Sequence, residues 1–487
     1  MKRFLVSINA IFRGFLFTGV LILSTSINNN GFCQPTFQRL YGSMDNDEGY
    51  SVTRCSSGGY LVSGSTSNFY TTYPDLYLLR LTENGDTIWT RSYLSPEISD
   101  WGTIGIEALD HSFVVGFNCS CDTSYISLHK YDDNGKRLWA KNYNLNIDPY
   151  IRSVINTPDS GIVFCGISGW PVENIFIIRT DKTGNEIWRR SYGGNYYFDD
   201  YRSQKIMRTS DNGYMVCGNN YVDGGIDFVH GILIKTDTSG VATWIKEYPS
   251  TDYTRRHFTD VLQNPDNSYI IAGYDAYSDF MNRDFYPFLM KTDQNGNIAW
   301  TQFYDFAKGI YSVFRTNSNQ YTITGGIYTD TAVVAKTDLD GNLFWSAFIT
   351  SKYQNSIFNA SIPASDSGYI FTGSAASNYG YGGKDVLVLK ANQEGIITSL
   401  QDDNSSVNNN ELTVWPNPCT EKIEVKSECT INLLSIFDSQ GICLYKSSSG
   451  TDFRNGHIIQ TGTFPKGLLF IQSITNQGIY SQKFIRL

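Results

Sequence analysis

Charged residues and histidines are scarce in this chain of 487 residues. Only 17% of the residues are charged, and there are five histidines. The histidines form no HExxH pattern and no close cluster with cysteines, so the sequence predicts no metal site. It also has no GxSxG element, no phosphate-binding P-loop and no run of lysine and arginine. We therefore expect no bound cofactor and no nucleic-acid partner.

Long apolar runs are lacking as well, with one exception near the N-terminus. Residues 14–23 are apolar and follow Lys2, Arg3 and Arg13. This arrangement is typical of a signal peptide, which we place at 1–33 with cleavage before Gln34. No other run has the length of a membrane span. Removing the segment, which holds three basic and no acidic residues, leaves 35 basic against 47 acidic residues and a net charge of −12.

Aromatic residues and glycine, in contrast, are abundant. The chain contains 33 Tyr, 29 Phe and 43 Gly. This mix favours β-structure with many tight turns. No segment shows the 3.6-residue apolar period of a long helix. We expect an all-β protein.

An internal repeat is the strongest feature of the chain. In its first copy, LRLTENGDTIW, Arg80 precedes Gly85 by five positions and Trp89 follows it by four. Seven copies recur every 45–56 residues, and the last, LKANQEGIITS, lacks the tryptophan; their glycines are Gly85, Gly135, Gly184, Gly240, Gly296, Gly341 and Gly395. A second element, GGYLVSG in the first copy, precedes each. Such a period indicates a solenoid or propeller.

Each unit divides into four short strands, A to D in chain order, separated by turn residues. Four antiparallel strands at this period form a propeller blade. The segment FQRLY at 37–41 resembles WTRSY at 89–93, the D strand of the first unit. We predict that it completes the last blade, which would leave the ring without an open edge. The prediction is a seven-bladed β-propeller over 34–400.

The K/R-T-D-x-x-G-x-x-x-W segment resembles the tryptophan-docking repeat of pyrroloquinoline-quinone-type propellers. The whole unit is similar to repeats of exported proteins from the Bacteroidetes. The resemblance implies that the tryptophan of one blade packs on the glycine peptide of a neighbouring blade. It concerns the fold and leaves the function open, because propellers host many activities.

The C-terminal part of the chain has a different pattern. The polar stretch QDDNSSVNNN indicates a linker, placed at 401–411. Residues 412–487 resemble the type A sorting domain of the type IX secretion system, a small β-sandwich that acts as an export signal. The resemblance rests on Pro416, Asn417, Pro418, Gly467 and Lys483. It implies the secretion machinery as a partner, and export through the periplasm to the outer cell surface or beyond.

The two ends of the predicted ring differ. The A–B and C–D links are tight turns, whereas the B–C and D–A links are longer and rich in aromatic and acidic residues. Loops on a rigid scaffold are where binding usually resides, and aromatic rings beside carboxylates suit sugars. We expect ligand contacts from Trp170, Tyr221, Tyr277, Tyr379, Asp223 and Asp275. The structural alternative is that these loops pack on themselves.

Two classes of function remain open. The first is a non-catalytic module that binds a glycan or a protein, in which no residue has a catalytic role. The alternative is a glycan-active hydrolase or lyase that uses carboxylates on the loop-rich end of the ring. Two carboxylates about 5–10 Å apart in a cleft would favour the enzyme.

Overall fold

The computed structural model divides the chain into two compact units, one over Gln34–Ser405 and one that includes Ser406–Leu487. The predicted signal peptide and the predicted linker lie outside the described residues. The structure describes residues 36–42, 46–67, 74–93, 99–120, 124–145, 149–168, 174–192, 205–221, 229–249, 254–278, 283–315, 319–326, 330–376, 383–397, 413–427, 430–437, 443–447, 453–454, 456–475 and 479–487.

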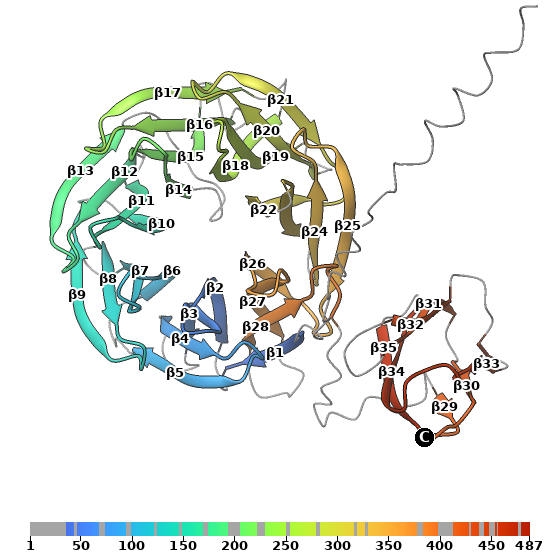
Figure 1. Ribbon diagram of the computed structural model, residues 1–487. Coiled ribbons are helices and arrows are strands. Elements are labelled where there is room, and N and C mark those ends of the chain that lie inside the picture. The colour runs from blue at the N-terminus through green and yellow to red at the C-terminus, as the bar shows by residue number, and fades with distance from the viewer. Residues whose placement is uncertain are drawn as a thin grey trace, which may run out of the picture. The chain divides into compact units, whose positions relative to one another are not determined.

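The first unit is a ring of seven four-stranded antiparallel blades (Figure 1). Strand A of each blade lies nearest the centre and strand D runs along the rim. Blades 1 to 4 consist of β2 (Asn46–Arg54), β3 (Tyr60–Ser67), β4 (Asp75–Leu81) and β5 (Thr87–Tyr93); β6 (Ser99–Glu107), β7 (Phe113–Ser120), β8 (Tyr125–Tyr131) and β9 (Arg137–Tyr143); β10 (Tyr150–Asn156), β11 (Ile162–Ser168), β12 (Asn174–Thr180) and β13 (Glu186–Tyr192); and β14 (Lys205–Arg208), β15 (Tyr214–Tyr221), β16 (Val229–Thr236) and β17 (Ala242–Tyr248).

Blades 5 to 7 complete the ring and confirm the predicted seven-bladed fold. Their strands are β18 (Thr254–Gln263), β19 (Tyr269–Ser278), β20 (Arg283–Thr292) and β21 (Ile298–Phe303); β22 (Gly309–Arg315), β23 (Tyr321–Gly326), β24 (Thr331–Thr337) and β25 (Leu343–Thr350); and β26 (Ile357–Pro363), β27 (Tyr369–Ala376), β28 (Lys384–Ala391) and β1 (Phe37–Tyr41). The N-terminal strand β1 thus pairs with β28, with Phe37 opposite Lys390. In blade 1 the corresponding pair is Trp89 and Arg80, so β1 takes the place of a D strand as predicted.

A bulge in strand A explains the glycine that recurs in strand B. In blade 3 the pairing of β10 with β11 skips Arg152, and a β-carbon on Gly166 would stand 1.8 Å from the carbonyl oxygen of Tyr150. Blade 5 repeats this arrangement, because a β-carbon on Gly273 would stand 2.2 Å from the carbonyl oxygen of His257. Only glycine permits so close an approach of the two backbones.

The rim is held by contacts between each D strand and the C–D turn of the next blade. A β-carbon on Gly240, whose φ is +76°, would stand 2.6 Å from the ring of Trp188 in the preceding blade. Tyr192, four residues after that tryptophan, donates a hydrogen bond to the carbonyl of Gly240. The implied docking of tryptophan on glycine is confirmed at five junctions, with Phe37 on Gly85 at a sixth. Trp89 is buried and the other repeated tryptophans are half-buried.

The repeated basic residue of strand C holds the A–B turn of its own blade. Lys235 contacts Asp211 at 2.7 Å, and the same pair recurs in four other blades. In blade 1, where the turn has no aspartate, Arg80 donates instead to Ser57 and to the carbonyl of Gly58. This basic residue therefore has a structural role.

The second unit is a small β-sandwich, as predicted. One sheet is formed by β29 (Thr413–Trp415), β30 (Lys422–Lys426) and β33 (His457–Gln460). The other is formed by β32 (Cys443–Ser447), β31 (Ile431–Phe437), β34 (Gly467–Thr475) and β35 (Ile479–Arg486). Its buried core includes Val414, Ile423, Ile436, Leu469 and Phe484.

Candidate ligand-binding end of the propeller

The loop end of the ring is where the B–C and D–A links lie, and the six predicted contact residues were assigned to it from the sequence. Trp170, Asp223 and Tyr379 fall outside the described residues. Tyr221 ends β15 and Tyr277 lies near the end of β19, but only their backbones are described. Asp275, two positions before Tyr277 on β19, is the one predicted contact residue whose side chain is described.

Asp275 belongs to a buried ion pair in blade 5. Its carboxylate accepts two hydrogen bonds from Arg256 of β18, from Nε at 2.8 Å and from Nη2 at 2.7 Å. Arg256 also donates through Nη1 to the carbonyl of Pro249, in the link between blades 4 and 5. Both residues are less than 10% exposed. The pair therefore ties this link to the strand that carries Tyr277, and positions the loop end rather than facing solvent.

A second buried group lies beside this pair. His257 stacks on Tyr274 with 4.8 Å between ring centroids, and its Nδ1 is 3.1 Å from the side-chain nitrogen of Asn219. The amide oxygen of Asn219 accepts a hydrogen bond from the backbone of Phe258. Blades 4 and 5 are thereby joined at the loop end by side chains as well as by the parallel pairing of Val229 with Arg255.

At the loop end of blade 4, three neighbouring strands, β15, β16 and β17, each carry one polar side chain of a contacting row. Asn220 donates to Glu247 Oε1 at 2.6 Å, and His230 Nδ1 lies 3.4 Å from Glu247 Oε2. Sequence reasoning missed this row, although Glu247 lies in the repeated WIKEY segment. It also missed Arg256 and His257, for which the run TRRHF at the start of β18 was an available signal.

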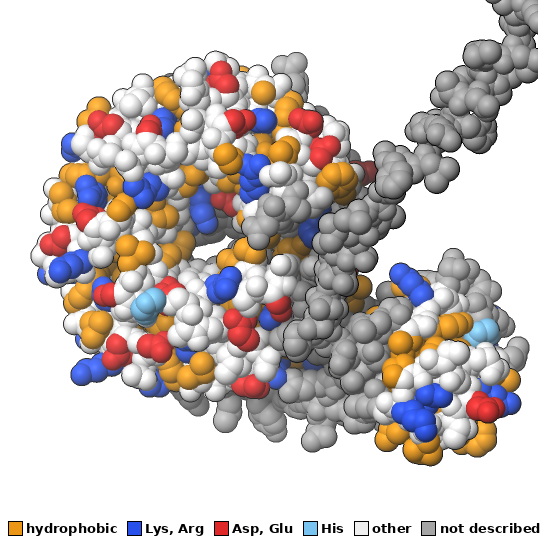
Figure 2. All heavy atoms as spheres, in the orientation of Figure 1, with side chains coloured by type: hydrophobic (Ala, Val, Ile, Leu, Met, Phe, Trp, Pro, Cys, Tyr) orange, Lys and Arg blue, Asp and Glu red, His pale blue; other side chains and the backbone are white. Residues whose placement is uncertain are grey.

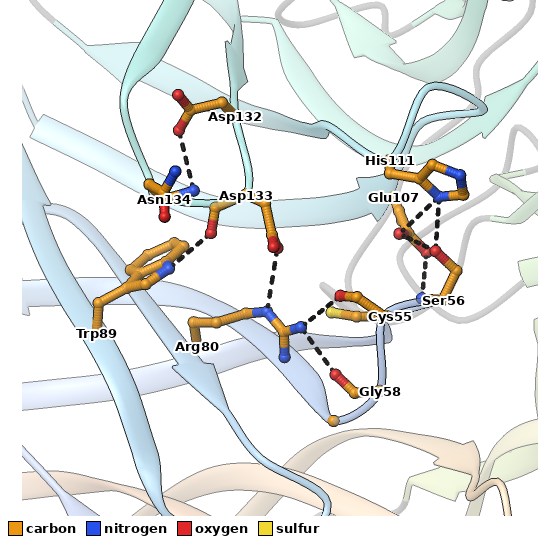
Figure 3. Close-up of polar contacts among 12 residues, drawn as sticks. Cys55, Ser56, Gly58, Arg80, Trp89, Glu107, His111, Asp132, Asp133 and Asn134 are labelled. Carbon is orange, nitrogen blue, oxygen red and sulfur yellow. Dashed lines mark hydrogen bonds and ion pairs between the residues drawn. The ribbon is translucent and has the colours of Figure 1, made fainter.

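The turn end contains one cluster that resembles a catalytic constellation (Figure 3). Ser56 Oγ lies 2.6 Å from both His111 Nδ1 and Glu107 Oε1, and the Ser56 amide donates to Glu107 Oε2. In a catalytic triad the serine and the acid contact different imidazole nitrogens. Here both lie at Nδ1, since Glu107 Oε1 is 3.5 Å away from the same atom.

The repeat itself assigns this cluster a structural role. At the same positions of blades 4 and 5, Ser210 bonds Gln263 through its amide and Asn267 through its hydroxyl. In blades 4 and 5, Gln263 stands where Glu107 stands in blade 2, and the contact is kept. Its shared role is to join two adjacent A–B turns, and this role requires no catalytic serine. Figure 3 also shows Arg80 reaching from strand C to Gly58 and Asp133.

The C–D turns likewise use their polar groups internally. Asp338, whose segment DLDGN resembles the start of a calcium loop, accepts backbone hydrogen bonds from Asp340 and Asn342 at 2.9 and 2.8 Å. Its second oxygen accepts from the Asn342 side chain. The same turn is built on Asp132, Asp181, Asp237 and Asp293. Asp338 is thus a turn residue, and the described part of the chain contains no cluster of three metal-ligating acidic, histidine or cysteine side chains.

Figure 2 shows the ring open at its centre, where the A strands of Figure 1 converge. The A strands of blades 3 to 5 contain several basic residues, among them Arg152, Lys205 and Arg255. The described residues include no helix with the length and hydropathy needed to cross a membrane.

The first residues of the C-terminal unit are hydrogen-bonded to its last strand. The loop after Trp415 contains two cis prolines, Pro416 and Pro418. Between them, Asn417 accepts a hydrogen bond from the backbone of Ile485 at 2.9 Å, and Cys419 exchanges backbone bonds with the same strand end. Gly467 begins β34 with a φ of +118°, and Lys483 pairs with Phe470 across the sheet. The five predicted motif residues thus lie in the opening loop and in the adjoining strands β34 and β35.

A family model described as "Secretion system C-terminal sorting domain" matches residues 413–486. These residues form a type IX secretion sorting domain. The sorting domain marks the chain for export by the type IX system, so the protein interacts with that machinery and reaches the cell surface or the medium. No curated protein matches the sequence.

Solved structures similar to the chain are propeller-like and distant. Polysaccharide lyase Uly1 has a TM-score of 0.45 at 8% identity, with coverage of 71% of this chain and 90% of the other. The Pan2 WD40 domain of Neurospora crassa has a TM-score of 0.43 at 11% identity, covering 73% and 94%. An α-L-arabinanase of Penicillium chrysogenum complexed with arabinobiose has a TM-score of 0.40 at 12% identity, covering 62% and 96%. With TM-scores below 0.5, these likenesses carry no argument about this chain.

Proposed function

We propose that the exported propeller is a non-catalytic binding module whose ligand, a glycan or a protein, contacts the loop end of the ring. One observation carries the proposal. The polar side chains of the turn end recur from blade to blade and are used by the architecture, as the Lys235–Asp211 pair and the Asp338 turn illustrate. At the loop end, the contact of Asn219 with Phe258 also recurs, as Asn118 with Ile151 between blades 2 and 3. The Arg256–Asp275 pair of blade 5 and the Asn220–Glu247 bond of blade 4 have no counterpart among the described residues.

The aligned positions of the B strands make this difference concrete. Asn220 and Asp275 stand two residues after the strand-B glycine of blades 4 and 5. The same position holds Thr66 in blade 1, Ser168 in blade 3 and Ala375 in blade 7. A side chain that the fold needed would be repeated, so the larger amide of Asn220 and carboxylate of Asp275 in two neighbouring blades support a function specific to that part of the ring.

The enzyme alternative requires two carboxylates that face a cleft and move protons. Asp275 instead accepts hydrogen bonds from Nε and Nη2 of Arg256 and is 4% exposed. A carboxylate fixed in this way positions its neighbours, which favours binding over hydrolysis or lysis.

The proposal is tested by screening the mature chain on a glycan array and against extracellular proteins, followed by substitutions on each end of the ring. Trp170→Ala and Tyr277→Ala should weaken binding of the strongest hit. Asn134→Ala and Asn295→Ala, in the C–D turns, should leave it unchanged. If only the turn variants lose binding while all four proteins stay folded, the assignment to the loop end is wrong.

A further inference from the structure

Three neighbouring strands of blade 4 end at the loop end in Asn220 of β15, His230 of β16 and Glu247 of β17. The register places Asn220 opposite His230, and Glu247 opposite Ile232 on the outer side. Exposure rises along the row, from 7% at Asn220 to 21% and 44% for the side chains of His230 and Glu247. The row therefore leads from the solvent to a buried amide.

The amide oxygen of Asn220 is buried and has no hydrogen-bond donor among the described residues. Its orientation is fixed, because the amide nitrogen donates to Glu247, and a carboxylate can only accept. A buried acceptor without a donor costs free energy and needs an explanation such as a ligand or an ordered water. Within the described residues, the row thus holds one buried acceptor without a donor beside a partly exposed carboxylate.

This arrangement is specific to blade 4. The position of Glu247, three residues after the repeated tryptophan, holds Ser92, Asn142 and Ser191 in the first three blades. In blade 2, Asn142 accepts a hydrogen bond from Ser127. The carboxylate at the same place in blade 4 is therefore not a requirement of the fold.

We propose that Asn220, His230 and Glu247 form a subsite for a neutral, polyhydroxylated ligand, namely a sugar unit with two neighbouring hydroxyl groups. One hydroxyl donates to the Asn220 amide oxygen and the next donates to the Glu247 carboxylate, while His230 contacts the outer edge of the same unit. This inference rests on the proposed function, since it places one saccharide contact on the loop end.

The charges of the row favour a hydroxyl over a cation. Glu247 already accepts a hydrogen bond from Asn220 and lies within ion-pair distance of His230. Its negative charge is thus shared with two donors, and a lysine or arginine of a protein ligand would compete with them. A hydroxyl adds a hydrogen bond without adding a charge, and it can also accept one from the imidazole.

The test is titration of the mature, full-length chain with a panel of neutral hexose and pentose oligosaccharides, with a lysine-rich peptide as the cationic probe. We expect at least one neutral oligosaccharide to bind. Glu247→Gln and Asn220→Ala should each weaken it about tenfold or more, because the first removes the charge that strengthens a hydrogen bond from the ligand and the second removes a buried acceptor. Asn142→Ala, at the position of Glu247 in blade 2, is the matched control and should have no effect.

Three results would overturn the subsite: no neutral oligosaccharide binds at millimolar concentration, binding survives both substitutions, or the lysine-rich peptide binds and is lost in Glu247→Gln. Thermal unfolding of each variant excludes misfolding as the cause, and Glu247→Gln changes a partly exposed side chain. If a ligand binds and responds to Tyr277→Ala but not to Asn220→Ala or Glu247→Gln, the subsite fails and the proposed function stands. If it responds only to C–D turn variants, both fail.

Discussion

Trp188 of blade 3 lies against Gly240 of blade 4, so closely that a β-carbon on the glycine would stand 2.6 Å from the indole. Gly240 has a φ of +76°, a conformation that other residues rarely adopt. Two properties of glycine are thus required at one position: the ability to adopt a positive φ, and the absence of a β-carbon. The repeat preserves glycine there in every blade.

Gly240→Ala should lower the free energy of unfolding of the propeller by about 2–5 kcal/mol, from the left-handed backbone and from the clash with Trp188. Gly58→Ala is the matched control, since its φ is +91° but nothing lies within 4 Å of a β-carbon there. It should cost only about 1–2 kcal/mol. Urea unfolding followed by tryptophan fluorescence measures both. Equal losses would mean that the indole contact contributes nothing.

The junction between blades 6 and 7 differs from the other six. Ala347 and Ile349, rather than Trp345, are the neighbours of a β-carbon on Gly395. Trp188, which does dock on a glycine, is half-buried, so Trp188→Ala should lower the free energy of unfolding by about 3 kcal/mol, at the lower end of the range for a tryptophan. Trp345→Ala should cost at least about 1 kcal/mol less. Thermal unfolding compares the two, and a larger loss for Trp345→Ala would contradict the docking argument.

The ion pairs of the A–B turns make stability depend on pH in the acid range. Burial alone would raise the pKa of Asp211, but hydrogen bonds from Lys235 and Thr209 outweigh it and lower the pKa to about 2. An unfolded aspartate has a pKa of about 3.9, so the stabilisation is complete above about pH 4 and is lost as the pH falls toward 2. Because the Asp211 carboxylate is 62% exposed, screening reduces the contribution.

Asp211→Asn should therefore flatten the loss of stability between about pH 4 and 2, and should lower stability at pH 7 by less than about 1 kcal/mol. Urea midpoints measured across this range test it, with Lys235→Met as the partner variant. If the wild type and Asp211→Asn have parallel pH profiles, the pair does not control acid stability.

Deleting residues 412–487 should separate export from folding. The described ring ends its last blade at Ala391 and has its own core, so the truncated chain should unfold with the midpoint of the intact propeller. It should accumulate in the periplasm, because the sorting domain has been removed. Cell fractionation and surface proteolysis are the measurements. Normal surface display of the truncated chain would contradict the export role.

Much of the fold could be predicted because it repeats. Gly85 and its six counterparts, the tryptophans beside them and the FQRLY segment that precedes the first unit predicted the number of blades and the closure of the ring. The site could not be predicted in the same way. Asp275 looked like an exposed loop acid, and its buried partner Arg256 lies 19 positions away on another strand. Periodicity reveals what all blades share, whereas the proposed subsite depends on side chains that one blade has and the others lack, such as Glu247.

Whether the ligand lies on the loop end is tested most directly by hydrogen–deuterium exchange of the mature chain, with and without the strongest hit of the glycan and protein screen. Protection should appear in peptides that contain the strand ends 214–221, 254–258 and 274–278, and should be absent from the C–D turns at 132–136 and 293–297. Protection confined to those turns, with the strand ends unchanged, would contradict the assignment of the loop end as the binding surface.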